Sequence, residues 1–176
     1  MVNEKKFESY PVWMALVYYF FTFSVYFAGL YLLYLIHPLL TLPLFAIVVY
    51  LEVSVLKNGC TRCYYYGKRC VCAKGKVAKL FFRKSDRKFN ERKITGKSMI
   101  PSFLPTIAAV AAGLYLVWTR LPAIDPVIIL LAAWPLIETF LGNPVLYGRM
   151  ACPHCKQREL GCPACEFFMK KRPEKK

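Results

Sequence analysis

The feature that most constrains this chain is a run of 43 residues, from 9 to 51, that contains no Lys, Arg, Asp or Glu. A second run, of 22 residues without a charged side chain, separates Lys97 from Arg120. An α-helix needs about 20 apolar residues to cross the hydrocarbon core of a bilayer, so the first run accommodates two crossings and the second run one. A soluble domain of this size has too little interior to bury these segments. The sequence therefore predicts a multi-pass integral membrane protein.

Turn and capping residues divide the apolar segments into four predicted membrane-spanning helices. We expect the first helix to run from Pro11 to Ile36 and the second to end at Leu56. The third is expected over 101–119 and the fourth over 126–141, where Gly142-Asn143-Pro144 is expected to stop it.

The basic residues are distributed very unevenly between the predicted loops. Of the 25 Lys and Arg residues, 24 lie before the first helix, between the second and third, or after the fourth, and Arg120 alone lies on the other side. Short loops that are rich in Lys and Arg stay on the cytoplasmic side of a membrane. We therefore expect a cell-membrane protein with both termini and the loop from Lys57 to Lys97 in the cytoplasm.

All eight cysteines fall in these predicted cytoplasmic segments, in two groups of four. The first group has the spacing C-x2-C-x6-C-x-C and the second has C-x2-C-x6-C-x2-C. Two thiolates on one tight turn can share a tetrahedral metal ion, so each group predicts a metal site. The predicted ligands are Cys60, Cys63, Cys70, Cys72, Cys152, Cys155, Cys162 and Cys165.

Two resemblances bear on the kind of metal site. Cys152-Pro153-His154-Cys155 and Cys162-Pro163-Ala164-Cys165 look like the knuckles of zinc ribbons and rubredoxins, and the shared C-x2-C-x6-C spacing resembles each half of the binuclear zinc clusters of fungal transcription factors. Zinc is the favoured ion, because the cysteine spacing does not match that of the usual ferredoxins. An iron–sulfur cluster is the alternative, because four thiolates suit both. Disulfides are disfavoured because cytoplasmic thiols are normally kept reduced. Each group could hold its own ion, or the two groups could pair at a common site.

The order of parts is repeated in the two halves of the chain. Each half has two predicted crossings, then a glycine turn and a cysteine motif, which makes the repeat parallel. The predicted fold is therefore an all-α membrane protein with four transmembrane helices in two parallel repeats, each followed by a small zinc-knuckle-like cytoplasmic module. The expected parts are a helical hairpin, the first module, a basic amphipathic segment, a second hairpin, and the second module with a basic tail. They cover 1–57, 58–75, 76–100, 101–148 and 149–176.

The loop from Lys57 to Lys97 carries 14 basic residues against Asp86 and Glu91. Within it, residues 76–89 are expected to form an amphipathic helix that lies on the anionic inner leaflet of the bilayer. An acidic protein or a nucleic acid is the alternative partner for this charge.

Two carboxylates, Glu52 and Glu138, occupy matching places in the predicted even-numbered helices. Carboxylates within a membrane are candidates for an ion site by default, although each could instead reach interfacial water. No catalytic constellation, phosphate loop or nucleotide fingerprint is visible in the sequence, and its two His are 117 residues apart. An enzyme is therefore not favoured, and no small-molecule substrate can be inferred. Three hypotheses remain: a scaffold with structural zinc, a membrane iron–sulfur redox protein, and a metal or ion transporter that uses Glu52 and Glu138.

The strings Cys63-Tyr64-Tyr65-Tyr66-Gly67-Lys68 and, over 155–164, Cys-Lys-Gln-Arg-Glu-Leu-Gly-Cys-Pro-Ala resemble motifs of an uncharacterised family of prokaryotic, mainly archaeal, four-helix membrane proteins. The resemblance would cover most of the chain. It implies no activity.

Overall fold

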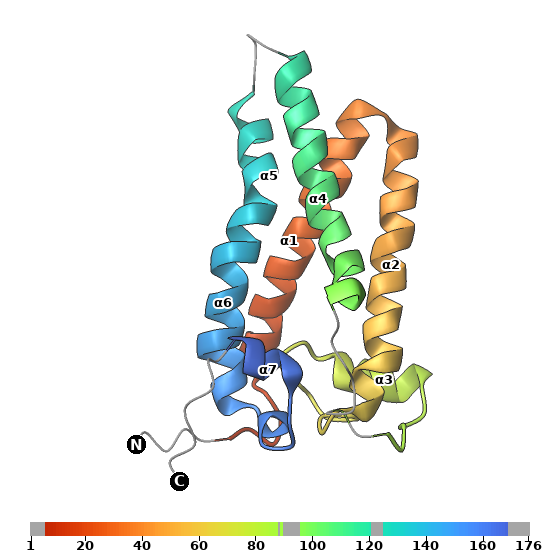
Figure 1. The fold of residues 1–176 in the computed structure, drawn as a ribbon, viewed down its shortest axis with the longest axis vertical. Helices are drawn as coiled ribbons and strands as arrows, with labels where there is room; N and C mark the ends of the chain where they lie inside the picture. The colour runs from red at the N-terminus through yellow and green to blue at the C-terminus, as the bar shows by residue number, and fades with distance from the viewer. Residues whose placement is uncertain (1–5, 88, 90–95, 121–124, 169–176) are drawn as a thin grey trace. The chain divides into compact units, whose positions relative to one another are not determined.

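The computed structural model describes residues 6–87, 89, 96–120 and 125–168. In this part of the chain the regular structure is helical, with one isolated β-bridge between Phe7 and Cys155 and no β-strand (Figure 1). The predicted turn at 121–122 and the basic stretches at 90–95 and 169–176 lie outside the described residues.

Four segments are long and apolar enough to cross a membrane, which confirms that part of the sequence prediction. They contain α1 (Val12–Ile36), α2 (Thr41–Asn58), α4 (Gly96–Thr119) and α5 (Pro126–Ile137). Many of their large apolar side chains are exposed, among them Trp118 at 80%. Exposed apolar side chains on long helices are expected where lipid is the solvent, since a water-soluble protein rarely exposes such an area. The shorter elements are η1 (Pro38–Leu40), η2 (Cys60–Arg62), α3 (Lys74–Phe81), η4 (Glu138–Gly142), α6 (Asn143–Val145), η5 (Leu146–Ala151), η6 (Cys152–His154), η7 (Lys156–Arg158) and α7 (Pro163–Phe168).

The fourth helix does not end at Gly142-Asn143-Pro144, so the predicted stop is wrong. After α5 the chain continues through the π-helical turn η4, the short α6 and a second π-helical turn, η5, as far as Ala151. A π-turn moves the backbone hydrogen bonds by one residue, which lets a helix pass Pro144 although proline has no N–H to donate.

The amphipathic helix predicted over 76–89 is shorter than expected. It is α3, which ends at Phe81, and Phe82 has an extended backbone. Tertiary hydrogen bonds hold the residues that follow. The Tyr66 hydroxyl donates to the Phe82 carbonyl oxygen (2.8 Å), and the Ser85 N–H donates to the Thr61 carbonyl oxygen (3.1 Å).

The chain divides into two compact units. One unit, which we call the helix unit, consists of Tyr19–Ser54 and Thr95–Gly142. Its core contains Leu32 from α1, Ala112 and Leu116 from α4, and Ile128 from α5.

Small residues allow the helices of this unit to approach closely. A Cβ on Gly113 of α4 would lie 2.2 Å from the Cβ of Ala132 in α5, and a Cβ on Gly29 of α1 would lie 3.3 Å from Cδ2 of Leu44 in α2. Small residues at helix crossings are typical of membrane bundles, because close backbone packing replaces the hydrophobic effect there.

The other unit consists of Met1–Tyr18, Val55–Ile94 and Asn143–Lys176. We call it the cysteine unit, because all eight cysteines belong to it. Its buried core includes Tyr10 and Met14 from the N-terminal segment, Tyr65 and Val71 from the first cysteine motif, and Ala151 just before the second.

Candidate metal centre

The first cysteine motif begins with a three-ten turn that follows α2 directly. The Cys63 N–H donates to the Cys60 carbonyl oxygen (3.3 Å), and the Tyr66 N–H donates to the Cys63 carbonyl oxygen (3.0 Å). Gly67 then takes a positive φ of 77°, a conformation that glycine adopts without strain. Its N–H donates to the Gly75 carbonyl oxygen (2.9 Å), which closes the loop that carries Cys70.

The second cysteine motif begins with the same kind of turn. The Cys155 N–H donates to the Cys152 carbonyl oxygen (3.2 Å), and the Arg158 N–H donates to the Cys155 carbonyl oxygen (3.3 Å). Gly161 has a positive φ of 82° and leads into Cys162, where α7 follows. Both C-x2-C pairs therefore have equivalent local backbone structure, with a glycine-dependent turn before the later cysteines.

The four sulfurs of the second motif lie close together. Cys165 is within hydrogen-bonding reach of the thiols of Cys152, Cys155 and Cys162. Three of the four residues are buried and form one cluster, against which Cys155 packs. None of the eight cysteines forms a disulfide.

The sulfurs of the first motif are less completely gathered. Cys70 and Cys72 are hydrogen-bonded to each other, and Cys63 interacts electrostatically with Cys60 and Cys70. Cys63 also interacts electrostatically with Cys155 of the second motif. The two motifs thus lie next to each other within the cysteine unit.

The thiol hydrogen bonds determine which cysteines ionise most easily. The hydrogen bond from Cys72 lowers the pKa of Cys70 to about 6, and that from Cys165 lowers the pKa of Cys155 to about 6. Burial instead raises the pKa of Cys63 to about 12. The thiolate is the form of cysteine that binds metal. Cys70 and Cys155, which have the lowest pKa values, therefore lose their protons to form ligands most easily.

No group of three Cys, His, Asp or Glu side chains in the described part of the chain is arranged to hold a metal ion. The predicted ligands are gathered within each motif to different extents. His154 lies inside the second C-x2-C pair and packs against the ring of Phe7, with ring centroids 4.8 Å apart.

Tyrosines and a glutamine join the two motifs to each other. The side-chain carbonyl of Gln157 accepts the Tyr64 N–H (2.6 Å), and the Tyr65 hydroxyl accepts the Lys156 N–H (3.1 Å). Tyr65 also donates to the Phe7 carbonyl oxygen (2.7 Å), so the same residue contacts the N-terminal segment.

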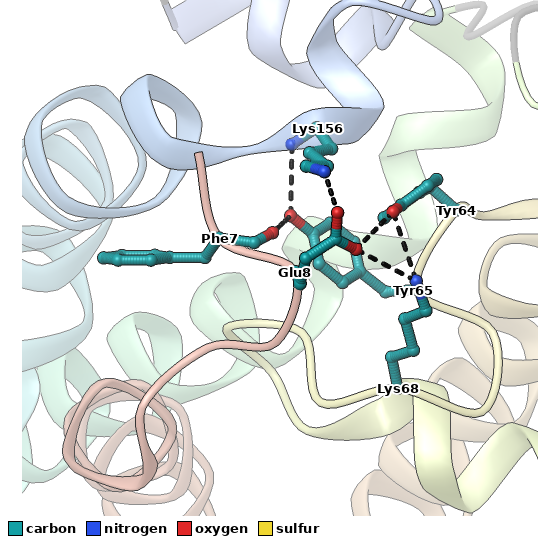
Figure 2. A network of polar contacts seen from close by, with 6 residues as sticks. All are labelled: Phe7, Glu8, Tyr64, Tyr65, Lys68 and Lys156. Carbon is teal, nitrogen blue, oxygen red and sulfur yellow. Dashed lines mark hydrogen bonds and ion pairs between the residues drawn. The ribbon is translucent and has the colours of Figure 1, made fainter. Parts of the chain in front are cut away.

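The N-terminal segment is the part of this unit that sequence reasoning missed. Figure 2 shows Glu8 between Lys156 of the second motif and Lys68 of the first, with ion pairs to both. The Tyr64 hydroxyl donates to the same carboxylate (2.5 Å). Phe7 pairs with the second motif through the backbone, since its N–H donates to the His154 carbonyl oxygen (3.0 Å). No local pattern in the sequence marks these residues, because their partners are about 60 and 150 residues away.

In the helix unit, a tyrosine that was not predicted interacts with the two carboxylates of the candidate ion site. The Tyr26 hydroxyl of α1 donates to Oε1 of Glu52 (3.0 Å) and also interacts electrostatically with Glu138. Glu138 is 8% exposed and lies in the π-helical turn η4. The chain therefore brings both predicted carboxylates into the surroundings of one tyrosine.

No known protein family, curated protein or solved structure matches this chain. The function must therefore be argued from the geometry of these residues.

Proposed function

We propose that this is a cell-membrane protein whose two cysteine motifs bind zinc on the cytoplasmic side, where the ions stabilise a scaffold that presents a surface to partners. The observation that carries the proposal is the position of Cys165 within hydrogen-bonding reach of the other three sulfurs of its motif. Both motifs belong to one unit that also contains the first turns of α1 and the last turn of α2.

The gathered thiols of the second motif suit a tetrahedral ion such as zinc. Tetrahedral zinc with Zn–S bonds of about 2.3 Å separates its sulfurs by about 3.8 Å, which is close to the separation of thiols that share a hydrogen bond. An entering zinc ion would displace the thiol protons into solvent and replace these hydrogen bonds by metal bonds, and the sulfurs would have to shift into a ligand arrangement that the described residues do not have. A site with four protein ligands and no open position is structural rather than catalytic.

The proposed orientation follows from the charge distribution and supports the metal assignment. With 24 of the 25 Lys and Arg residues on one side of the predicted helices, the cysteine motifs face the cytoplasm. Thiols in that compartment stay reduced and available for metal.

Purification without oxygen, followed by elemental analysis, tests the proposal. We expect a colourless protein with about one zinc ion for each closed four-thiolate site. A brown protein that contains iron and acid-labile sulfide would replace the scaffold by the alternative, a membrane redox protein with iron–sulfur clusters. Protein without metal, with eight thiols that react freely with an alkylating reagent, would refute both.

The exposed face of α3 supports a lipid surface as one partner. Leu80 and Phe81 are 79% and 70% exposed, and the neighbouring Lys79, Arg83 and Lys84 are exposed as well. Apolar side chains flanked by basic ones suit the boundary of an anionic inner leaflet. Binding of an acidic protein or a nucleic acid to the purified protein in neutral-lipid nanodiscs would favour the alternative partners.

A second function, ion transport, is favoured by one specific observation. Tyr26 is hydrogen-bonded to Glu52 and interacts with Glu138, which makes it a third polar group beside two carboxylates in helices of membrane-spanning length. Burying polar side chains within a membrane costs free energy, so those that occur there usually have a function. Flux of zinc, copper, sodium or protons through reconstituted vesicles is the measurement that tests it.

A further inference from the structure

The cysteine unit contains a cleft of about 670 Å³ where its two cysteine motifs meet. Its volume lies within the range of about 300 to 1,000 Å³ that is usual for small-molecule sites. One wall comes from the first motif and the residues after α3, and the other from the second motif. The lining residues are Arg62, Cys63, Tyr64, Tyr66, Lys68, Lys84, Phe89, Gln157 and Leu160.

The charged residues that line this cleft are all basic. Lys68 is paired with Glu8, so its charge is partly compensated. Lys84 is exposed, and no carboxylate in the described residues forms an ion pair with it or with Arg62. Among the described residues, the positive charge of the cleft is therefore only partly compensated.

Arg62, one of the residues that line the cleft, also has a donor that the described residues leave unused. Its Nε atom is buried, and in the part of the chain that the structure describes it has no hydrogen-bond partner. A buried donor without an acceptor costs about 1 to 3 kcal/mol, so such a group is normally satisfied by something. A guanidinium in a cleft with two lysines suits an anion with several oxygens, because Arg can donate two parallel hydrogen bonds to it.

We propose that this cleft binds a phosphate group, with Arg62 and Lys84 as its main contacts. Aromatic and apolar side chains, Tyr66, Phe89 and Leu160, line the rest of the cleft and would contact the organic part of the ligand. Arg62 also ends the second candidate membrane span, Pro38–Arg62, and lipid headgroups are expected at the end of such a span. The phosphate can therefore come from an anionic lipid or from a soluble phosphate compound.

Because Cys63 and Gln157 both line the cleft, a bound phosphate would contact residues of both motifs. Gln157 is already hydrogen-bonded to the Tyr64 backbone, so ligand binding should stabilise this junction. The proposal does not depend on metal binding.

The test uses the full chain in a neutral maltoside detergent and measures binding by titration calorimetry. The soluble probe is inorganic pyrophosphate. The lipid probes are short-chain phosphatidic acid and, as the uncharged comparison, short-chain phosphatidylcholine. The variants are Arg62→Gln and Lys84→Gln, with Arg149→Gln as the matched control, because Arg149 is an exposed basic residue of the same unit that neither lines the cleft nor belongs to the α3 face.

We expect the parent protein to bind phosphatidic acid, pyrophosphate or both, and to bind phosphatidylcholine weakly or not at all. Removing a charged hydrogen-bond donor should weaken binding at least about tenfold in Arg62→Gln, and to a smaller extent in Lys84→Gln. Arg149→Gln should bind like the parent. Binding of phosphatidic acid alone identifies a lipid headgroup, and binding of pyrophosphate identifies a soluble source.

Failure of the parent to bind either anionic probe overturns the proposal. An equal loss of binding in all three variants also overturns it, because the effect would then reflect net charge rather than the cleft. If Arg62→Gln proves unstable in thermal unfolding, Lys84→Gln decides alone, since an exposed lysine can be replaced without disturbing the fold.

Discussion

The Tyr10 hydroxyl donates a hydrogen bond to the Ala151 carbonyl oxygen over 2.6 Å, and both residues are buried. Tyr10 lies two residues before α1, and Ala151 immediately precedes the second cysteine motif. This single bond joins segments 141 residues apart in the sequence and helps to hold the N-terminal segment in the cysteine unit.

Replacement of Tyr10 by Phe keeps the ring and removes the hydroxyl. We expect Tyr10→Phe to lower the free energy of unfolding by about 1 to 2 kcal/mol, because the buried Ala151 carbonyl oxygen loses the hydroxyl that donates to it. The midpoint of thermal unfolding in detergent measures this. Tyr34→Phe, which removes an exposed hydroxyl of α1, is the control and should leave the midpoint unchanged. Equal midpoints for the two variants would show that the Tyr10 bond does not stabilise the unit.

Gly75 has no room for a side chain. A Cβ there would lie 2.0 Å from the Tyr65 carbonyl oxygen and 2.5 Å from that of Lys68, and both are backbone atoms that cannot move aside cheaply. We expect Gly75→Ala to cost about 3 kcal/mol or more and to yield mostly aggregated protein in size-exclusion chromatography. Gly29→Ala is the control, since its nearest contact is a Leu44 methyl at 3.3 Å that can shift. A monodisperse Gly75→Ala protein with parental stability would contradict the described geometry.

The metal proposal predicts different outcomes for two neighbouring residues. Cys152→Ser should lower the bound metal by about one ion per chain, because a structural zinc site rarely tolerates the loss of a thiolate. His154→Gln should keep the metal, since we assign all four ligands of the second motif to cysteine. Elemental analysis of both purified variants measures this. Loss of metal from His154→Gln with retention in Cys152→Ser would reverse the ligand assignment.

Topology can be tested with reporters in the whole chain. Fusion after Lys176 and insertion near Ser85 should both read cytoplasmic, and insertion near Pro122 should read external, because Arg120 is the sole basic residue on that side. Modification from outside intact cells of a cysteine placed near Ser85 would contradict this orientation. It would also remove the argument from a reducing compartment.

The transport candidate predicts a functional loss without a structural one. Glu52→Gln and Glu138→Gln should each leave the cysteine metal and the unfolding midpoint close to those of the parent, while any flux in reconstituted vesicles is abolished. Asp86→Asn, an exposed carboxylate of the cysteine unit, is the control and should transport like the parent. Parental flux in both glutamate variants, or no flux of any ion in the parent, would contradict ion transport and favour the scaffold hypothesis.

The sequence by itself determined the features that depend on neighbours along the chain. Four helices of membrane-spanning length follow from charge-free runs such as 9–51, since a helix satisfies its own backbone and needs only apolar side chains to enter lipid. The local spacing of Cys152 and Cys155 was likewise enough to predict a tight turn, because one turn closes within four residues.

Only the tertiary structure decided how these parts come together. It continued the fourth helix past Pro144 through π-helical turns. It ended α3 at Phe81, where the Tyr66 hydroxyl donates to the Phe82 carbonyl oxygen and the Ser85 N–H donates to the Thr61 carbonyl oxygen. It also brought Tyr26 to Glu52 and Tyr10 to Ala151. Each of these contacts joins residues that share no local pattern, and its stability comes from desolvation and hydrogen bonding in a packed interior. A window of neighbouring residues contains no information about which distant group will satisfy a buried hydroxyl or carboxylate, so these contacts appear only when the chain is folded.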